Sequence, residues 1–243
     1  MSTDWLVPDW PVPTSVRACV TTLSGGVSQP PFHSFNLGDH VGDDPQAVAE
    51  NRRRLRDALD CQPAWLSQVH GVRAVEADPA RVLEADASWS ATPGVACVIL
   101  TADCVPVLFC DRAGTRVAAA HAGWRGLASG MLETTLEALA CAPGDVLVWL
   151  GPAIGPQAFE VGPEVREAFL VGYPQAQAAF QPSANPGKFL TDLYHLARIR
   201  LAACGVAAVY GGGLCTWSDP RFYSYRRAAR TGRFASLIWL AAR

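Results

Sequence analysis

Two histidines and one cysteine are the side chains of this sequence best suited to chemistry. His70, Cys104 and His121 each stand in a short polar segment at the end of an apolar stretch of strand length. Because strand ends gather at the edge of a sheet, we expect the three segments to share one cleft. Imidazole nitrogens and a thiolate are zinc ligands, and three of them leave a fourth tetrahedral position for water or substrate. Taken singly, however, Cys104 also fits a packed core cysteine and His70 a turn histidine.

Turn and cap signals predict the elements that position these residues. A helix is expected over 46–59, with Asp44 as its N-cap and Pro45 at its first position. Further helices are expected over 127–139, 163–171 and 192–204, and the proline-rich residues 1–14 are expected to be irregular or strand-like. Strands are expected over 17–22, 64–66, 72–76, 95–101, 105–110, 116–120, 146–150, 206–210, 222–225 and 234–239. This order predicts a single α/β domain over 1–243, of the mixed α+β kind, with mixed β-sheets and helices on the outside.

Length and composition exclude several classes of protein. The chain has 243 residues, of which 50% are apolar and 17% charged, so it can build a large core and is not disordered. Its net charge of −2 provides no basic field for nucleic acid or an anionic membrane. No apolar run reaches the ~18 residues of a membrane span, and the first residues lack a signal-peptide pattern. We therefore expect a cytoplasmic protein that binds neither nucleic acid nor a membrane; the oligomeric state, monomer or dimer, stays open.

Several ordered motifs resemble those of one known family. They are Ser34-Phe-Asn-Leu-Gly38, Val41-Gly-Asp-Asp44, Gln68-Val-His-Gly71, Thr101-Ala-Asp-Cys104, His121-Ala-Gly-Trp-Arg-Gly126, Gly151-Pro-Ala-Ile-Gly155 and Tyr223-Ser-Tyr-Arg226 with Thr231-Gly232. Together they resemble the YfiH family, also labelled multicopper polyphenol oxidase or laccase-domain proteins, over roughly residues 20–240. The resemblance implies that His70, Cys104 and His121 bind one metal, usually zinc.

The resemblance also implies a fold and an activity. The fold is a layered sandwich of mixed β-sheets flanked by helices, distantly similar to the deamidating cytotoxic necrotizing factor toxins. The activity is phosphorolysis of the purine nucleosides adenosine, inosine and methylthioadenosine, with adenosine deamination also credited to the family. Some members are linked to peptidoglycan editing. One segment departs from the pattern, because 228–230 are Ala-Ala-Arg where many relatives carry an acidic residue before Thr-Gly.

Four further residues are candidates for work on the substrate. Arg125 and Arg226 are expected to hold phosphate, since a guanidinium matches its oxygens bidentately. Asn36 offers both a donor and an acceptor to ribose or base. Asp103, beside Cys104, is the nearest candidate acid, or else a residue that holds a ligand in place. The glutamate that zinc deaminases carry in H-x-E is absent, because Val72 and Gly123 occupy the corresponding positions.

Three other functions are weighed against phosphorolysis. Five histidines and no H-x-H pair are too few for four-copper chemistry, although copper in a His₂Cys site would allow slow phenol oxidation. Cys104 as nucleophile, with His70 or His121 as base, would make a cysteine amidase, and a zinc hydrolase would serve peptidoglycan precursor editing equally well. A purely structural zinc is disfavoured because no fourth ligand stands in a comparable segment.

Overall fold

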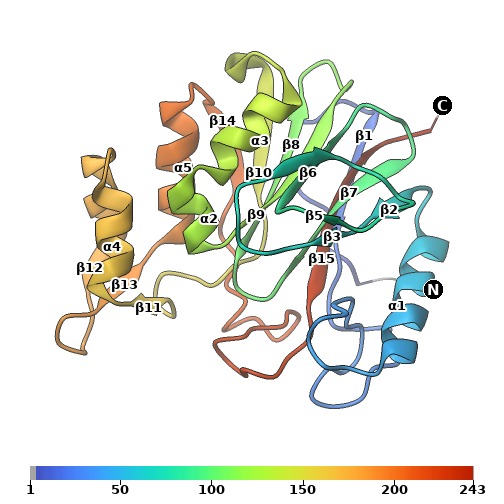
Figure 1. The fold of residues 1–243 in the computed structure, drawn as a ribbon, viewed down its shortest axis with the longest axis horizontal. Coiled ribbons are helices and arrows are strands. Elements are labelled where there is room, and N and C mark those ends of the chain that lie inside the picture. The colour runs from blue at the N-terminus through green and yellow to red at the C-terminus, as the bar shows by residue number, and fades with distance from the viewer. Residues whose placement is uncertain (1–3, 243) are drawn as a thin grey trace.

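A computed structural model describes residues 4–242, so the first three residues of the expected irregular segment 1–14 lie outside the described range. Two mixed β-sheets form the centre of the molecule (Figure 1). The first has the order β1 (Val16–Val20), β15 (Phe234–Leu240), β7 (Val95–Thr101), β2 (Gln62–Ala64). The second has the order β14 (Ala208–Gly211), β10 (Val146–Leu150), β8 (Val105–Asp111), β9 (Val117–Ala122), β6 (Ala87–Ser90), β4 (Ala74–Glu76).

Helices cover the two outer faces of this pair of sheets. One side carries α1 (Pro45–Ala58), and the other carries α2 (Trp124–Ser129), α3 (Met131–Leu139) and α5 (Leu193–Ala203) (Figure 1). At the end of the molecule far from α1, α4 (Pro163–Leu170) lies beside a small sheet of β11 (Glu160–Val161), β13 (Phe189–Thr191) and β12 (Phe180–Pro182). The remaining elements are the pair β3 (Leu66–Ser67) and β5 (Leu83–Glu84) and the 3-10 turns η1 (Pro143–Asp145) and η2 (Pro174–Ala179).

The alternation of side chains along each strand divides the core into layers. In β7, Cys97 and Ile99 pack between the two sheets, whereas Val98 and Leu100 face α1. In β9, Val117 and Ala119 face the other sheet, and the alternate residues pack beneath α3 and α5. The predicted layered sandwich of mixed sheets flanked by helices is therefore confirmed.

This layering determines where two of the candidate ligands lie. His121 shares the strand face of Val117 and Ala119, so its ring points into the space between the sheets near the end of β9. Cys104 lies on the short connection by which the chain leaves β7 in one sheet and enters β8 in the other. Both residues consequently stand at an end of the sandwich.

Most predicted elements are present within a residue or two of their expected bounds. The helix α1 begins at Pro45 with Asp44 as N-cap, whose side chain accepts the amide proton of Gln46. The single helix expected over 127–139 is wrong: Gly130, with φ of 105°, ends α2 and begins α3. The strand expected over 222–225 is also wrong. That stretch is irregular, and it packs Phe222 and Tyr223 into the core between the sheets, with the Tyr223 hydroxyl donating to the Phe32 carbonyl at 2.7 Å.

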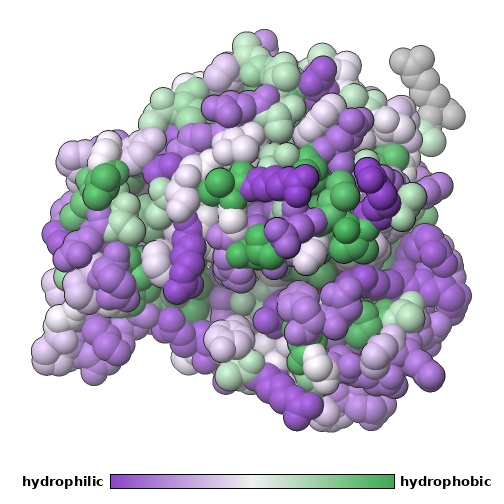
Figure 2. Space-filling model, in the orientation of Figure 1, coloured by the Kyte–Doolittle hydropathy of each residue, from purple (hydrophilic) through white to green (hydrophobic). Residues whose placement is uncertain are grey.

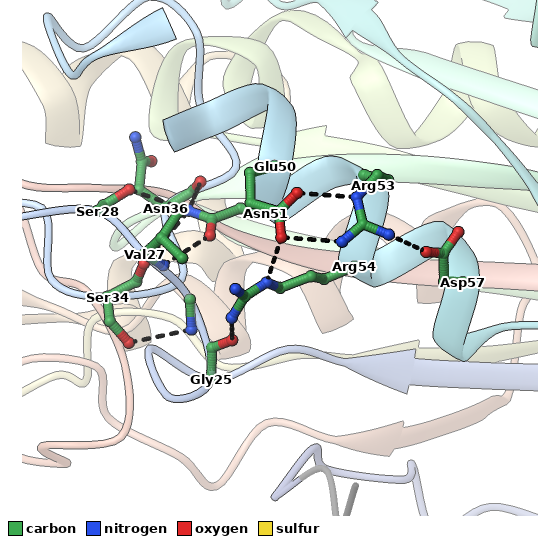
Figure 3. Close-up of polar contacts among 11 residues, drawn as sticks. Gly25, Val27, Ser28, Ser34, Asn36, Glu50, Asn51, Arg53, Arg54 and Asp57 are labelled. Carbon is green, nitrogen blue, oxygen red and sulfur yellow. Dashed lines mark hydrogen bonds and ion pairs between the residues drawn. The ribbon is translucent and has the colours of Figure 1, made fainter. Parts of the chain in front are cut away.

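A buried asparagine of α1 holds the long loop that follows β1 (Figure 3). The Oδ1 atom of Asn51 accepts from the Val27 amide at 2.9 Å, and its Nδ2 donates to Ser28 Oγ and to the carbonyls of Ser34 and Asn36. Helix α1 thus fixes the backbone around Asn36 by side-chain hydrogen bonds as well as by apolar packing.

No helix within residues 4–242 is long and apolar enough to cross a membrane. On the face seen in Figure 2, hydrophilic residues cover most of the surface and apolar ones gather near its middle.

The break between α2 and α3 generates a stability prediction. Gly130→Ala should lower the free energy of unfolding by about 1–2 kcal/mol, because an L-residue at this φ is strained. The added methyl group would meet no atom closer than 3.7 Å, so the cost is conformational. The measurement is urea unfolding, with Gly144→Ala as the control, since Gly144 has open space and no positive φ. Equal unfolding midpoints for the two variants would contradict this account.

Candidate metal centre

The structure brings His70, Cys104 and His121 together. Their ligand atoms all lie within 4.8 Å of one another, and Cys104 Sγ is 3.9 Å from His70 Nε2. The two imidazole rings meet edge to face with centroids 4.6 Å apart. Among residues 4–242 this is the one cluster of at least three His, Cys, Asp or Glu side chains with metal-ligand spacing.

One buried carboxylate organises two of the three side chains. Asp86, fully buried just before β6, lies 2.8 Å from His121 Nδ1. It also accepts the amide protons of Val69, His70 and Gly71 at 3.2, 2.9 and 2.7 Å. Because Nδ1 of His121 is engaged, Nε2 remains to face the cluster, an arrangement common around metal-bound histidines. Asp86 therefore sets the ring orientation of His121 and the backbone position of His70.

Two residues of the cluster segments adopt left-handed backbone conformations that side chains other than glycine rarely take. His70 has φ of 60° and Asp103 has φ of 94°. The neighbouring structure holds Asp103 in place: its Oδ1 accepts from the Thr216 hydroxyl at 2.6 Å, and its Oδ2 accepts from the Arg226 amide at 2.6 Å. Such conformations persist where surrounding contacts over-determine them, which is typical of functional sites.

Close approach at Gly123 explains one glycine of the His121 motif. A Cβ atom there would lie 3.0 Å from His70 Cδ2 and 3.1 Å from Cys104 Sγ. Both contacts would be tight, so a glycine best allows the turn after β9 to pass this close to His70 and Cys104.

The electrostatics of the cluster favour a charged pair in the metal-free protein. Burial by itself would raise the pKa of the Cys104 thiol, but His121 and His70 lower that pKa to about 6. Burial by itself would lower the pKa of His121, but the Cys104 thiolate and Asp86 raise it to about 9. Near neutral pH Cys104 is therefore a thiolate beside an imidazolium, and the thiolate is the form that binds metals.

The donor set fits one zinc ion. Zinc bonds of ~2.3 Å to sulfur and ~2.0 Å to nitrogen at tetrahedral angles put sulfur about 3.5 Å from each nitrogen, close to the 3.9 Å between Cys104 Sγ and His70 Nε2. Within residues 4–242 a trinuclear copper cluster finds no such set, because none of the other three histidines, His33, His40 and His195, joins the cluster.

The cluster forms part of the wall of a cavity of about 340 Å³, within the usual size of small-molecule sites. Of the residues named from the sequence, Asp103 and Arg226 also line this cavity. Its remaining walls include residues that sequence reasoning gave no role: His40, Gln68, Phe159, Tyr225 and Arg233.

Three predicted substrate-binding residues have other surroundings than expected. Asn36 is fully buried, does not line the cavity, and uses its amide in four hydrogen bonds within the protein. Arg125 is exposed outside the cavity and stacks on Trp124 at 4.4 Å. Arg226 reaches the cavity, but its Nη1 and Nη2 donate to the carbonyls of Ala158 and Glu160 at 3.1 and 3.2 Å.

Sequence reasoning also missed Asp86 and Arg233. Asp86 stands between two alanines just before a strand, and a carboxylate in so apolar a context is a signal for a buried ionic partner. Arg233 directly precedes the apolar run of β15, at the edge of a strand like the three candidate metal ligands.

Comparison with known proteins shows the family of this chain. The chain belongs to the family described as multi-copper polyphenol oxidoreductase laccase, whose family model matches residues 17–241. A relative named purine nucleoside phosphorylase PA4543, from Pseudomonas aeruginosa, is 70% identical over 97% of this chain and 98% of its own length. Purine nucleoside phosphorylase YfiH of Escherichia coli is 55% identical over 97% of this chain and 98% of its own length.

A solved structure confirms the fold. The crystal structure of Neisseria meningitidis protein NMB0706 matches with a TM-score of 0.95 and 50% identity, covering 98% of this chain and 100% of that one. The resemblance to the YfiH family, inferred from the motifs, is thereby confirmed.

The role of Asp86 generates a prediction about metal affinity. Asp86→Asn should weaken zinc binding by about 10- to 100-fold, because the amide cannot replace a carboxylate that orients a ligand and accepts backbone protons. The measurement is a zinc titration against a competing chelator. Asp111→Asn is the control, since Asp111 is also buried and bonded to backbone amides but contacts no ligand. Equal affinity in Asp86→Asn and the unaltered protein would contradict the assignment.

The lowered pKa of Cys104 generates a second prediction. In metal-free protein, alkylation of Cys104 by iodoacetamide should accelerate as the pH rises through about 6, because the thiolate forms above that pKa. Cys141, whose pKa burial raises, is the internal control and should react only at much higher pH. Mass spectrometry of modified peptides measures both rates. A Cys104 rate that rises only above pH ~8 would show an ordinary thiol.

Proposed function

We propose that the protein is a zinc-dependent purine nucleoside phosphorylase that acts on adenosine, inosine and methylthioadenosine. The observation that supports this most is the combination, in one cavity, of the His70–Cys104–His121 cluster with two arginines and two aromatic side chains. Relatives at 70% and 55% identity bear the name of that activity.

The reaction joins a phosphate oxygen to C1′ of the ribose while the bond between C1′ and N9 of the purine breaks. The electron pair of that bond leaves with the base, which takes up a proton, and ribose 1-phosphate is the second product. When bound by the cluster, zinc would supply a localised positive charge and an open coordination position beside the substrate.

The chain's own residues supply binding and orientation. Phe159 and Tyr225 line the cavity, and their ring faces are suited to stacking against a purine. Gln68 cannot turn freely toward substrate, because its amide donates to the Leu100 carbonyl at 2.9 Å and accepts from the Leu100 amide at 2.8 Å. It instead ties the segment that carries His70 to the end of β7.

Asp103 is better suited to positioning than to proton transfer in this scheme. Both of its oxygens accept hydrogen bonds from Thr216 and Arg226. This arrangement also weighs against adenosine deamination, which needs a mobile acid or base beside the attacking water.

One observation favours a second candidate, a cysteine amidase or hydrolase of the kind peptidoglycan precursor editing would need. Cys104, His121 and Asp86 stand in the order nucleophile, base and orienting carboxylate. Metal dependence separates the two: a cysteine hydrolase would retain its activity when zinc is removed, whereas a zinc phosphorylase would lose it. Copper-dependent phenol oxidation, the third alternative, would require activity that follows copper rather than zinc loading.

The proposal predicts strict dependence on phosphate. Zinc-loaded protein should convert inosine to hypoxanthine and ribose 1-phosphate, and removal of phosphate should abolish release of hypoxanthine. Cys104→Ser and His121→Ala should each lower the zinc content of the protein and should lower the rate of phosphorolysis at least 100-fold. The reason is that a site with three protein ligands loses much of its metal affinity when one ligand is removed. Cys141→Ser is the control, since that free cysteine is not in the cluster. Hypoxanthine release at an unchanged rate without phosphate would establish hydrolysis instead.

A further inference from the structure

Arg233 lines the cavity, and other residues of the protein bind only part of its guanidinium group. It lines the cavity directly before β15. Its Nη1 donates to the carbonyls of Thr231 and Gly232 at 3.1 and 3.0 Å, which leaves Nε and Nη2 for other partners. Within residues 4–242 no carboxylate lies within 4.0 Å of it, in contrast to Arg52, which pairs with Asp39.

The motif Ser34-Phe-Asn-Leu-Gly38 fixes the position of this arginine. The Oδ1 atom of Asn36 accepts the amide protons of both Arg233, at 2.8 Å, and Gly38, at 2.9 Å. Asn36 is held in turn by Asn51 of α1, which donates to its carbonyl at 2.9 Å (Figure 3). The motif therefore fixes the backbone position of Arg233.

Gly38 provides the space in which the arginine side chain lies. A Cβ atom at Gly38 would be 2.9 Å from Arg233 Cγ and 3.1 Å from Arg233 Cβ. These atoms are the base of the side chain and cannot move aside without redirecting the guanidinium. The stem of Arg233 thus occupies space that a side chain at position 38 would take.

The charge of Arg233 calls for an anion. Burial lowers the pKa of its guanidinium, whereas the charges of Cys104 and Asp103 raise it, so the group lies within electrostatic reach of the metal cluster. An arginine remains protonated even so. A half-buried charge without a counter-ion is unfavourable, and Asp103, the carboxylate among the cavity residues, already uses both oxygens.

We propose that Arg233, positioned by Asn36 and Gly38, is the phosphate-binding residue of the cavity. Resting on the proposed phosphorolysis, this assignment names the subsite for its second substrate. Arg226, the candidate from the sequence, is less suited because a carbonyl already binds each of its terminal nitrogens, whereas within residues 4–242 Nε and Nη2 of Arg233 have no hydrogen-bond partner. Two adjacent free donors of one guanidinium match two oxygens of a phosphate.

The kinetic test compares two variants that disturb Arg233 differently. Arg233→Lys keeps the positive charge but loses the two adjacent N–H donors of the guanidinium. Gly38→Ala keeps the arginine but displaces its side chain. Each should raise KM for phosphate by about tenfold to hundredfold, the loss expected for one charge-assisted contact. KM for inosine, zinc content and melting temperature should stay within about twofold or a few degrees of the unaltered protein. Arg81→Gln, which removes an exposed arginine, is the control for loss of charge.

A binding test keeps this assignment separate from the proposed reaction. Calorimetric titration of zinc-loaded protein with inorganic phosphate, without nucleoside, should show binding that Arg233→Lys and Gly38→Ala weaken. If phosphate binds in this way but no nucleoside is cleaved, the subsite stands and the phosphorylase proposal fails. If both variants bind phosphate like the unaltered protein, or if Arg226→Lys alone weakens it, the assignment to Arg233 is overturned.

Discussion

The whole site depends on one buried charge, the carboxylate of Asp86. Removing a carboxylate from water is costly unless hydrogen bonds replace the lost hydration. Three consecutive backbone amides and the imidazole of His121 supply those bonds, and they hold the pKa of Asp86 below its usual range although burial by itself would raise it. Because the same carboxylate contacts the His121 ring and the amide of His70, it fixes two metal-ligand candidates relative to each other.

The two-sheet architecture supplies the third ligand candidate. Cys104 lies where the chain crosses from β7 in one sheet to β8 in the other, and His121 lies on the inner face of β9, the neighbour of β8. The distance between them therefore follows from the antiparallel pairing of β8 with β9, in which Val105 lies opposite Ala122 and Pro106 lies opposite His121. The strained backbone of Asp103 at this crossing is held by the Ile154 amide on its carbonyl, and by Thr216 and Arg226 on its carboxylate. The arrangement of the strands thus also determines the geometry of the candidate metal ligands.

Local signals in the sequence are sufficient for most of the fold. The cap at Asp44 and Pro45 locates α1, and the apolar runs of β7, β8 and β10 are long enough to be recognised by themselves. What fails is decided by distant partners or by a single backbone angle. The helix break at Gly130 depends on one positive φ, which apolar periodicity does not reveal. Residues 222–225 follow an irregular path that buries two aromatic rings between the sheets. Their aromatic composition resembles that of a strand.

The site residues differ in the same way, since some are recognisable from local sequence and others only from their distant partners. His70, Cys104 and His121 are recognisable because each is an uncommon side chain at the end of an apolar run. Local sequence does not reveal the roles of Asn36 and Arg233, which are 197 positions apart in the chain. The two residues interact, since the side-chain oxygen of Asn36 accepts the amide proton of Arg233. The amide of Asn36 suggested direct contact with substrate, whereas sequence reasoning gave Arg233 no role. For Asn36 the structure shows a different physical role, which is to let two distant segments approach closely and hold them there. Gly38 leaves room for Arg233, and Gly123 leaves room for the side chains of His70 and Cys104. The motif Ser34-Phe-Asn-Leu-Gly38 thus marks close contact between two distant chain segments, and its asparagine does not line the cavity.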